Sequence, residues 1–135
     1  MELNIRALEA QDWETLETWW ESWKDWTPPP KDFTPNHGTG GFMVYKKDKP
    51  IVAGFVYLTN SKVSYLELIV SDPEYREDDR IDAIKLLITE SEEFVKSMGY
   101  KYFLTIGRHK NLIETHKKLG WKTDKENSIE LIKNL

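Results

Sequence analysis

Two arginines stand in a charged loop at residues 76–82, between a strand-like apolar run and a long amphipathic run. A strand that delivers its carboxyl end to the start of a helix forms an anion site, because the first N–H groups of the helix have no partner and the helix dipole is positive there. Arg76 and Arg80 would bind a phosphate directly. Whether the chain binds a phosphate-bearing cofactor should therefore depend on this loop.

The elements before this loop follow from the spacing of apolar residues. Leu3, Ile5 and Leu8 predict a short first strand. Residues 11–24 predict a helix, because four apolar residues share one face: Trp13, Leu16, Trp20 and Trp23. The following stretch, 27–41, holds four prolines and three glycines and is expected to be a long loop. Runs at 42–46, 51–58 and 63–70 predict an antiparallel meander, since the turns between them are too short for crossovers.

The elements after the loop complete an α/β pattern, α+β by a stricter convention. The long helix is predicted to begin near Asp79 and to end at Gly99. A strand at 101–106 would then lie parallel to its neighbour, because a helix connects the two. A second helix at 111–119 and a last pair of strands at 121–123 and 129–132 follow. We expect one domain over residues 1–135, with a mixed, mostly antiparallel sheet of about six or seven strands between helices on both faces.

Composition narrows the class of protein. The net charge of −4 argues against a general nucleic-acid binder, which usually carries a basic excess. No run approaches the roughly 18 apolar residues that span a membrane, and the first residues lack the apolar core of a secretory signal. The chain has no cysteine, so it has no disulfide and no thiolate metal site. Three scattered histidines do not predict a metal centre either. We expect a cytoplasmic protein without membrane or nucleic-acid partners.

Two motifs and the order of the elements carry a family resemblance. The run V-x-x-P-x-Y-R begins at Val70, after the central strand, and N-x-x-x-x-H-x-x-x-G-W begins at Asn111. In this order the chain resembles the GNAT family, the Gcn5-related N-acetyltransferases, over nearly its whole length. The tryptophan-rich helix and the proline and glycine loop also resemble small phage-encoded proteins of this type. The resemblance implies transfer of an acetyl group from acetyl-CoA to a primary amine.

The resemblance also implies a cofactor site. The backbone at Ile69, Val70 and Ser71 would pair with the pantetheine arm, and Arg76 and Arg80 would contact the pyrophosphate. Asn111 would touch CoA or only cap its helix. The family's loop carries glycines at this point, but residues 77–82 contain none and instead hold four carboxylates: Glu77, Asp78, Asp79 and Asp82. At about 4 Å each like-charge pair costs roughly 1 kcal/mol in water. The loop therefore predicts weakened CoA binding, a rebuilt loop or a lost site.

Two residues are candidates for proton transfer. His116 stands where the family has the tyrosine that protonates the leaving thiolate; otherwise it is a surface histidine. Glu67, on the central strand, is a candidate general base, or else it pairs with a neighbouring lysine or lies at an exposed edge. Strand alternation places Glu67 with Ile69 on one face and Leu66, Leu68 and Val70 on the other.

Other polar and aromatic groups have two interpretations each. His37, in the glycine-rich loop, shapes a substrate side or is a hinge. The tryptophans are more typical of core packing than of a cage for an amine cation. Arg108, His109 and Lys110 form a basic cluster that is either a solvated loop or a contact for the CoA phosphates.

Two functions from different classes follow. The first is an N-acetyltransferase in which a small-molecule or protein amine attacks the thioester directly within a ternary complex; protein N-termini, lysines, polyamines and aminoglycosides are all acceptors of this kind. The second is an inactive GNAT-like protein-binding module that has lost CoA. An edge strand or the tryptophan surface would also allow a homodimer.

Overall fold

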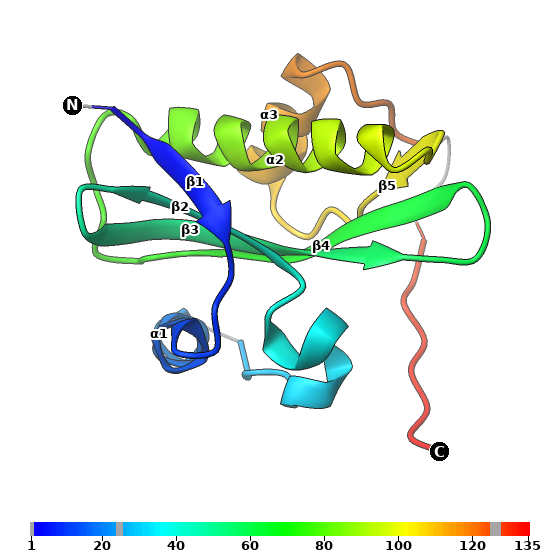
Figure 1. The fold of residues 1–135 in the computed structure, drawn as a ribbon, viewed down its shortest axis with the longest axis horizontal. Helices are drawn as coiled ribbons and strands as arrows, with labels where there is room; N and C mark the ends of the chain where they lie inside the picture. The colour runs from blue at the N-terminus through cyan, green and yellow to red at the C-terminus, as the bar shows by residue number, and fades with distance from the viewer. Residues whose placement is uncertain (1, 24–25, 125–127) are drawn as a thin grey trace.

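The computed structural model describes residues 2–23, 26–124 and 128–135, and in them one sheet lies between helices on its two faces (Figure 1). The sheet has five strands in the described residues, in the order β1-β2-β3-β4-β5. They are β1 (Asn4–Ala7), β2 (Gly41–Lys46), β3 (Lys49–Leu58), β4 (Val63–Ser71) and β5 (Tyr102–Leu104). Strands β1 to β4 pair antiparallel and β5 pairs parallel to β4. The predicted mixed, mostly antiparallel architecture is confirmed.

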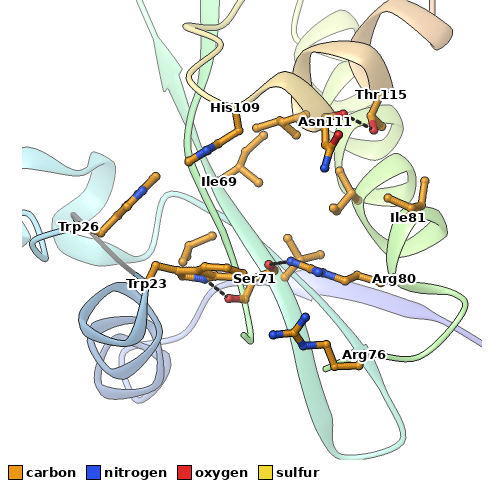
Figure 2. Close-up of a pocket in the computed structure, with 14 residues that line it drawn as sticks. Trp23, Trp26, Ile69, Ser71, Arg76, Arg80, Ile81, His109, Asn111 and Thr115 are labelled. Carbon is orange, nitrogen blue, oxygen red and sulfur yellow. Dashed lines mark hydrogen bonds between the residues drawn. The ribbon is translucent and has the colours of Figure 1, made fainter. Parts of the chain in front are cut away.

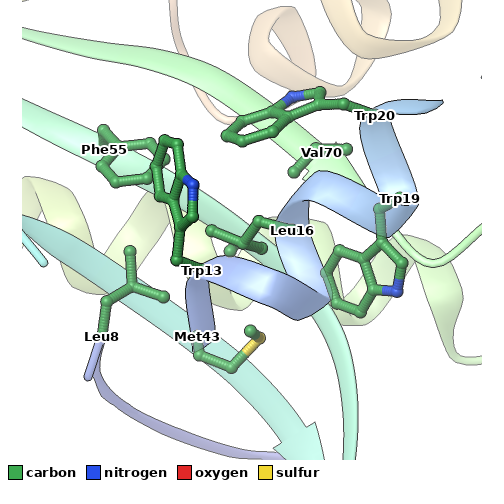
Figure 3. Close-up of a cluster of buried hydrophobic side chains, with 9 residues drawn as sticks. Leu8, Trp13, Leu16, Trp19, Trp20, Met43, Phe55 and Val70 are labelled. Atoms are coloured by element: carbon green, nitrogen blue, oxygen red, sulfur yellow. The ribbon is translucent and has the colours of Figure 1, made fainter. Parts of the chain in front are cut away.

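Helix α1 (Asp12–Ser22) covers one face of the sheet with aromatic side chains (Figure 3). The Trp20 ring stacks on Phe55 at 6.3 Å between centroids, and Trp13 meets Trp20 edge-on at 5.6 Å. Trp19 is buried in the same cluster. These three tryptophans are core residues, as the sequence favoured. The predicted helix end at Lys24 lies outside the described residues, and α1 itself ends at Ser22.

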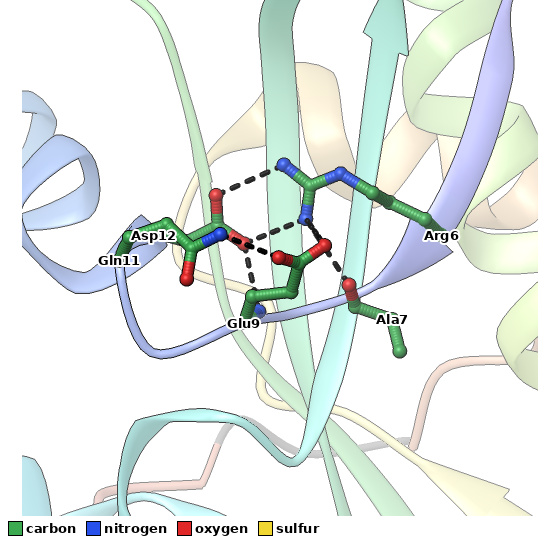
Figure 4. Close-up of polar contacts among 5 residues, drawn as sticks. All are labelled: Arg6, Ala7, Glu9, Gln11 and Asp12. Atoms are coloured by element: carbon green, nitrogen blue, oxygen red, sulfur yellow. Dashed lines mark hydrogen bonds and ion pairs between the residues drawn. The ribbon is translucent and has the colours of Figure 1, made fainter.

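The start of α1 is tied to β1 by an ion pair (Figure 4). Arg6 donates two hydrogen bonds to the Asp12 carboxylate, at 2.7 and 3.0 Å, and the Glu9 N–H donates a third at 2.8 Å. Burial raises the pKa of Asp12, but the bonds from Arg6 and Glu9 outweigh it, so the pKa is lowered. This link fixes the angle at which α1 crosses the sheet.

Helices α2 (Arg80–Ser97) and α3 (Lys110–Lys118) cover the opposite face. Leu87 and Ile88 of α2 are fully buried against the sheet. Helix α2 ends at Ser97 with Met98 as its C-cap, and Gly99 follows at the C′ position, as predicted, with φ +90°. There the Gly99 N–H donates to the Lys96 carbonyl and the Tyr100 N–H to the Val95 carbonyl, both at 3.1 Å. Glycine suits this position because it adopts positive φ without a Cβ clash.

The predicted last pair of strands is wrong. Residues 121–124 and 128–135 are irregular. Trp121 is instead the residue that closes α3: its N–H donates to the His116 carbonyl at 3.1 Å and its ring packs on Phe103. Among the described residues, no strand pairs with the outer edge of β5. The tail that follows is exposed, with Ile129 at 85% and Leu131 at 90%.

The loop between α1 and β2 contains two short 3-10 turns, η1 (Lys31–Phe33) and η2 (Pro35–Gly38). His37 lies in η2 with a left-handed backbone, φ +52°. It does not line either cavity described below.

Candidate active site

Strands β4 and β5 separate after Tyr65, the third residue of β4. They pair only at Val63–Tyr102, Ser64–Phe103 and Tyr65–Leu104. Beyond this point β4 carries a bulge, since its register with β3 shifts between Ala53 and Phe55. The bulge is centred on Leu68, whose φ is +58°. A non-glycine residue in this region costs roughly 1–2 kcal/mol, so the pairing on both sides must hold it there.

The bulge changes which side chains share a face. Glu67 lies directly opposite Phe55, a member of the α1-side core, and Leu68 and Val70 pack on that same core. Ile69 packs with the α2-side core. The predicted strict alternation, with Glu67 and Ile69 together, is therefore wrong. The prediction failed because β4 contains an extra residue at Leu68, which a strictly alternating strand would not have.

A cleft of about 340 Å³ opens beside β4 at the place where the strands separate (Figure 2). All six residues predicted to contact the cofactor line it: Ile69, Val70, Ser71, Arg76, Arg80 and Asn111. They come from β4, the following loop, α2 and α3. The fold thus brings together residues that are separated by up to 42 positions in the sequence, since 111 − 69 = 42.

One end of this cleft is positively charged. Arg76 and Arg80 line it, and Arg80 also donates to the Ser71 hydroxyl at 3.2 Å. The Nε of Arg80 is buried and has no partner among the described residues. The first turn of α2 lies here too: the Ala83 N–H makes the first bond to a carbonyl four residues back, Asp79, at 2.9 Å. The amides just before it have no partner within the helix, so this end suits an anion.

The acidic residues of the loop do not line the cleft. The Asp79 carboxylate accepts hydrogen bonds from Lys46 at 2.8 Å and from the Tyr75 hydroxyl at 2.6 Å. These two bonds lower the pKa of Asp79, that from Lys46 most. None of the four carboxylates lines the cleft, and Glu77, Asp78 and Asp82 are exposed. The effect of this loop on CoA binding stays a prediction.

Two tryptophans form the wall opposite α2 (Figure 2). The Trp23 indole N–H donates to the Ser71 carbonyl at 2.8 Å, and the Arg80 guanidinium lies 5.6 Å from the centre of the Trp23 ring. The Trp26 ring stacks on His109 at 6.0 Å between centroids. The sequence did not predict that Trp23, Trp26 and His109 lie together, because their contacts depend on how α1 and α3 meet at β4.

Glu67 lies where β5 leaves β4. Its Oε1 accepts the Ile106 N–H at 2.9 Å, and its Oε2 lies 3.8 Å from Arg108. Burial raises the pKa of Glu67 to about 7 against the opposing effects of those two groups. The side chain, 14% exposed, is neither paired with a lysine nor at an open edge. It does not line the cleft itself, but its partners Ile106 and Arg108 line a second cavity of about 20 Å³.

His116 lies outside the cleft, on the inner side of α3. Its Nδ1 is 2.9 Å from the Leu112 carbonyl, so that nitrogen carries the hydrogen. Its ring meets Trp121 edge-on at 4.8 Å, and Nε2 is buried without a partner in the described part of the chain. Burial lowers the pKa of the imidazole. It is 5% exposed, so it is not a surface histidine.

Asn111 stands in the first turn of α3 and lines the cleft, whereas His109 holds the N-cap position. Within residues 2–23, 26–124 and 128–135, no cluster of three or more acidic, histidine or cysteine side chains is placed to hold a metal ion. Among the same residues no helix is long and apolar enough to cross a membrane.

Comparison with known proteins identifies similar structures. No family model and no curated protein sequence matches the chain. The ribosomal-protein-S18-alanine N-acetyltransferase from Escherichia coli superposes with a TM-score of 0.70 at 16% identity, over 88% of this chain and 77% of that one. AAC(6')-Iy, in complex with a bisubstrate analogue, gives 0.69 at 18% identity over the whole of both chains. A GNAT superfamily phosphinothricin acetyltransferase from Sinorhizobium meliloti, with acetyl-CoA bound, gives 0.69 at 19% identity, over 89% of this chain and 75% of that one.

Proposed function

We propose that this chain, which has the fold of the GNAT acetyltransferases, transfers an acetyl group from acetyl-CoA to a primary amine. The observation that carries the proposal is the cleft beside β4. It combines a positive end, formed by Arg76 and Arg80 at the start of α2, with the strand edge at Ile69 to Ser71. An extended ligand with phosphates at one end and amides along its length matches this arrangement.

The residues present fit such a ligand. In the part of the chain that the structure describes, the buried Nε of Arg80 has no partner, and none of the loop's acidic side chains lines the cleft. Arg76 and Arg80 would bind the phosphates, and the backbone at Ile69 to Ser71 would orient the pantetheine arm. Bound there, acetyl-CoA supplies an activated thioester. The backbone N–H near Val70 would polarise its carbonyl.

Glu67 is proposed as the general base. A carboxylate with a pKa of about 7 is half deprotonated near neutral pH, which suits a group that must accept a proton and release it again. The Ile106 N–H fixes one of its oxygens at 2.9 Å and leaves the other oriented toward Arg108. The predicted role of His116 as proton donor to the thiolate stays a prediction, and its ring would first have to leave its present contacts.

The acceptor is proposed to be a primary amine of a small molecule or a protein. The similar structures include AAC(6')-Iy in complex with a bisubstrate analogue built on acetylneamine and the ribosomal-protein-S18-alanine N-acetyltransferase. A panel of polyamines, aminoglycosides and peptide N-termini, assayed by release of free CoA thiol, would identify the class.

The alternative is an inactive binding module with the same fold. The observation that favours it is the bond from Trp23 to the Ser71 carbonyl, because this bond uses an acceptor that a ligand lying along β4 would need. In that case Trp23 would keep the edge of β4 covered at Ser71, and the protein would not bind acetyl-CoA.

Isothermal titration with acetyl-CoA separates the two functions. We expect binding that weakens by about tenfold or more in Arg76→Ala and in Arg80→Ala, since a hydrogen bond to a charged group contributes roughly 1.5–3 kcal/mol. Lys49→Ala, which alters an exposed cation outside the cleft, is the matched control. Absence of heat at millimolar acetyl-CoA would exclude the acetyltransferase function.

A further inference from the structure

The two cavities of the site share one boundary. Four residues line both the large cleft and the small cavity beside the partners of Glu67: Trp26, Ile69, His109 and Leu112. Arg76 and Arg80 line the large cleft but not the small cavity. Figure 2 shows His109 and Trp26 at the end of the cleft away from Arg76. If the phosphates lie at the arginines, the reacting end of the ligand lies at this shared boundary.

Two features hold His109 at that boundary: its place at the start of α3 and its contact with Trp26. It is the N-cap residue of α3, with an extended backbone at φ −122° and ψ 133°. Its ring is stacked on Trp26 with an angle of 14° between the planes. The side chain is nevertheless exposed, so it can exchange protons with water.

His116, the sequence-based candidate for proton donation, is arranged differently. The single hydrogen of its neutral ring lies on Nδ1 and is bonded to the Leu112 carbonyl. Its other nitrogen is buried and is therefore an acceptor, not a donor. A second proton would have to enter a buried site, which is unfavourable.

We infer that His109, and not His116, is the acid that protonates the leaving thiolate. This inference rests on the proposed function. The acceptor nitrogen would attack the thioester carbon, a C–N bond would form and the C–S bond would break with its electron pair on sulfur. The His109 imidazolium would give its proton to that sulfur and yield the free thiol. Glu67 would take the proton lost by the nitrogen, and water would restore the proton of His109.

The charges around His109 favour this role. Arg108 precedes it and Lys110 follows it, and Arg76 and Arg80 line the same cleft. Arg108 lines the small cavity next to His109, so its cation lies nearest to negative charge that develops on sulfur at the shared boundary. Ile106 and Arg108, the partners of Glu67, line the same small cavity as His109, so the base and the acid both lie near the shared boundary.

The chain has three histidines, which makes a matched test simple. In His109→Gln we expect kcat to fall by about 100-fold or more, the usual contribution of a positioned acid, with an unchanged Kd for acetyl-CoA. His37→Asn is the control and should change neither value; asparagine tolerates the left-handed backbone of that position. His116→Gln is measured in parallel, with thermal unfolding to verify the fold of each variant.

A second measurement needs no acceptor amine. When acetyl-CoA is added to the wild-type protein, the ring resonances of His109 should shift in the NMR spectrum, and those of His37 should not. Unshifted His109 resonances in a protein that binds acetyl-CoA would overturn the inference, as would a loss of kcat in His116→Gln with none in His109→Gln. A wild-type protein that does not bind acetyl-CoA would instead refute the proposed function itself.

Discussion

Lys46 Nζ lies 2.8 Å from Asp79 Oδ2, and this pair joins the end of β2 to the residue before α2. Asp79 occupies the N-cap position, yet its side chain makes no capping bond. Its carboxylate is shared between Lys46 and Tyr75 instead. The contact explains how an acidic, glycine-free loop can border a site for an anion.

Replacing Lys46 with methionine should weaken acetyl-CoA binding. Asp79 would lose the cation that lowers its pKa most and would be free to turn toward the N-terminus of α2, where it competes with a phosphate. We expect a several-fold higher Kd by isothermal titration, because one like-charge contact in water costs roughly 1 kcal/mol. Lys46→Arg should restore the wild-type value, and equal binding by all three proteins would show that Asp79 is irrelevant to the anion site.

The acetylation rate should depend on the ionisation of Glu67. The pKa of this group is raised to about 7 by burial, so its basic form is lost below that pH. We expect kcat/KM to fall about tenfold for each pH unit below 7. In Glu67→Gln, kcat/KM should be low and should no longer fall as the pH drops below 7. A wild-type profile that is flat from pH 5 to pH 8 would contradict the base role.

The same group should make folding stability depend on pH. The folded pKa, about 7, lies above the ordinary value of 4.5, so the folded protein binds more protons than the unfolded chain between these values. The contribution of Glu67 to stability is thus present below about pH 4.5 and lost as the pH rises through 7. Relative to wild type, Glu67→Gln should gain on the order of 2–3 kcal/mol in unfolding free energy between pH 4 and pH 8, measured by urea denaturation. Glutamine keeps an acceptor for the Ile106 N–H, so any other sign would point to a different cause.

His116 should contribute a pH dependence of opposite sign. Burial lowers its pKa below 6.5, so the unfolded chain binds the proton more readily than the folded one. Its contribution is fully present above pH 6.5 and is lost as the pH falls through the folded pKa. Wild type should therefore lose stability relative to His116→Gln on acidification from pH 7.5 to pH 5, by at most about 1.4 kcal/mol per pH unit. A constant difference between the two proteins would show that the ring is not buried in its neutral form.

The exposed tail should promote self-association. Ile129, Leu131 and Leu135 are each at least 85% exposed, and the outer edge of β5 beside Tyr102 has no partner strand in the described residues. Apolar tails and open edges both favour pairing between chains. We expect a homodimer by light scattering after size exclusion, and a monomer with unchanged thermal unfolding after deletion of residues 128–135. A wild-type protein that stays monomeric at high concentration would exclude this contact.

Local patterns were sufficient to predict most of the fold. The spacing of Leu87, Ile88 and their neighbours predicted α2, Gly99 predicted its end, and the helix between β4 and β5 predicted their parallel pairing. The six residues proposed to contact acetyl-CoA follow from the family resemblance, and the structure places all of them around one cleft.

Long-range contacts account for what the sequence did not predict. The run 121–123 was predicted to be a strand, but Trp121 packs on His116 and Phe103. The orientation of Asp79 depends on Lys46, which is 33 residues away. The place of His109 depends on Trp26. No periodicity within a single element contains such information.

The bulge at Leu68 has a consequence for the numbering of β4 itself. In a regular strand successive side chains point to opposite faces, so the face that carries the candidate base depends on whether its position in the strand is odd or even. The additional residue changes that parity once, between Glu67 and Ile69. Deleting one residue from the start of β4 would therefore turn the carboxylate into the α2-side core, where Leu66 now lies, and bring Leu68 to the position that Glu67 now holds. The chemical surroundings of Glu67 therefore depend on the number of residues that precede it in β4.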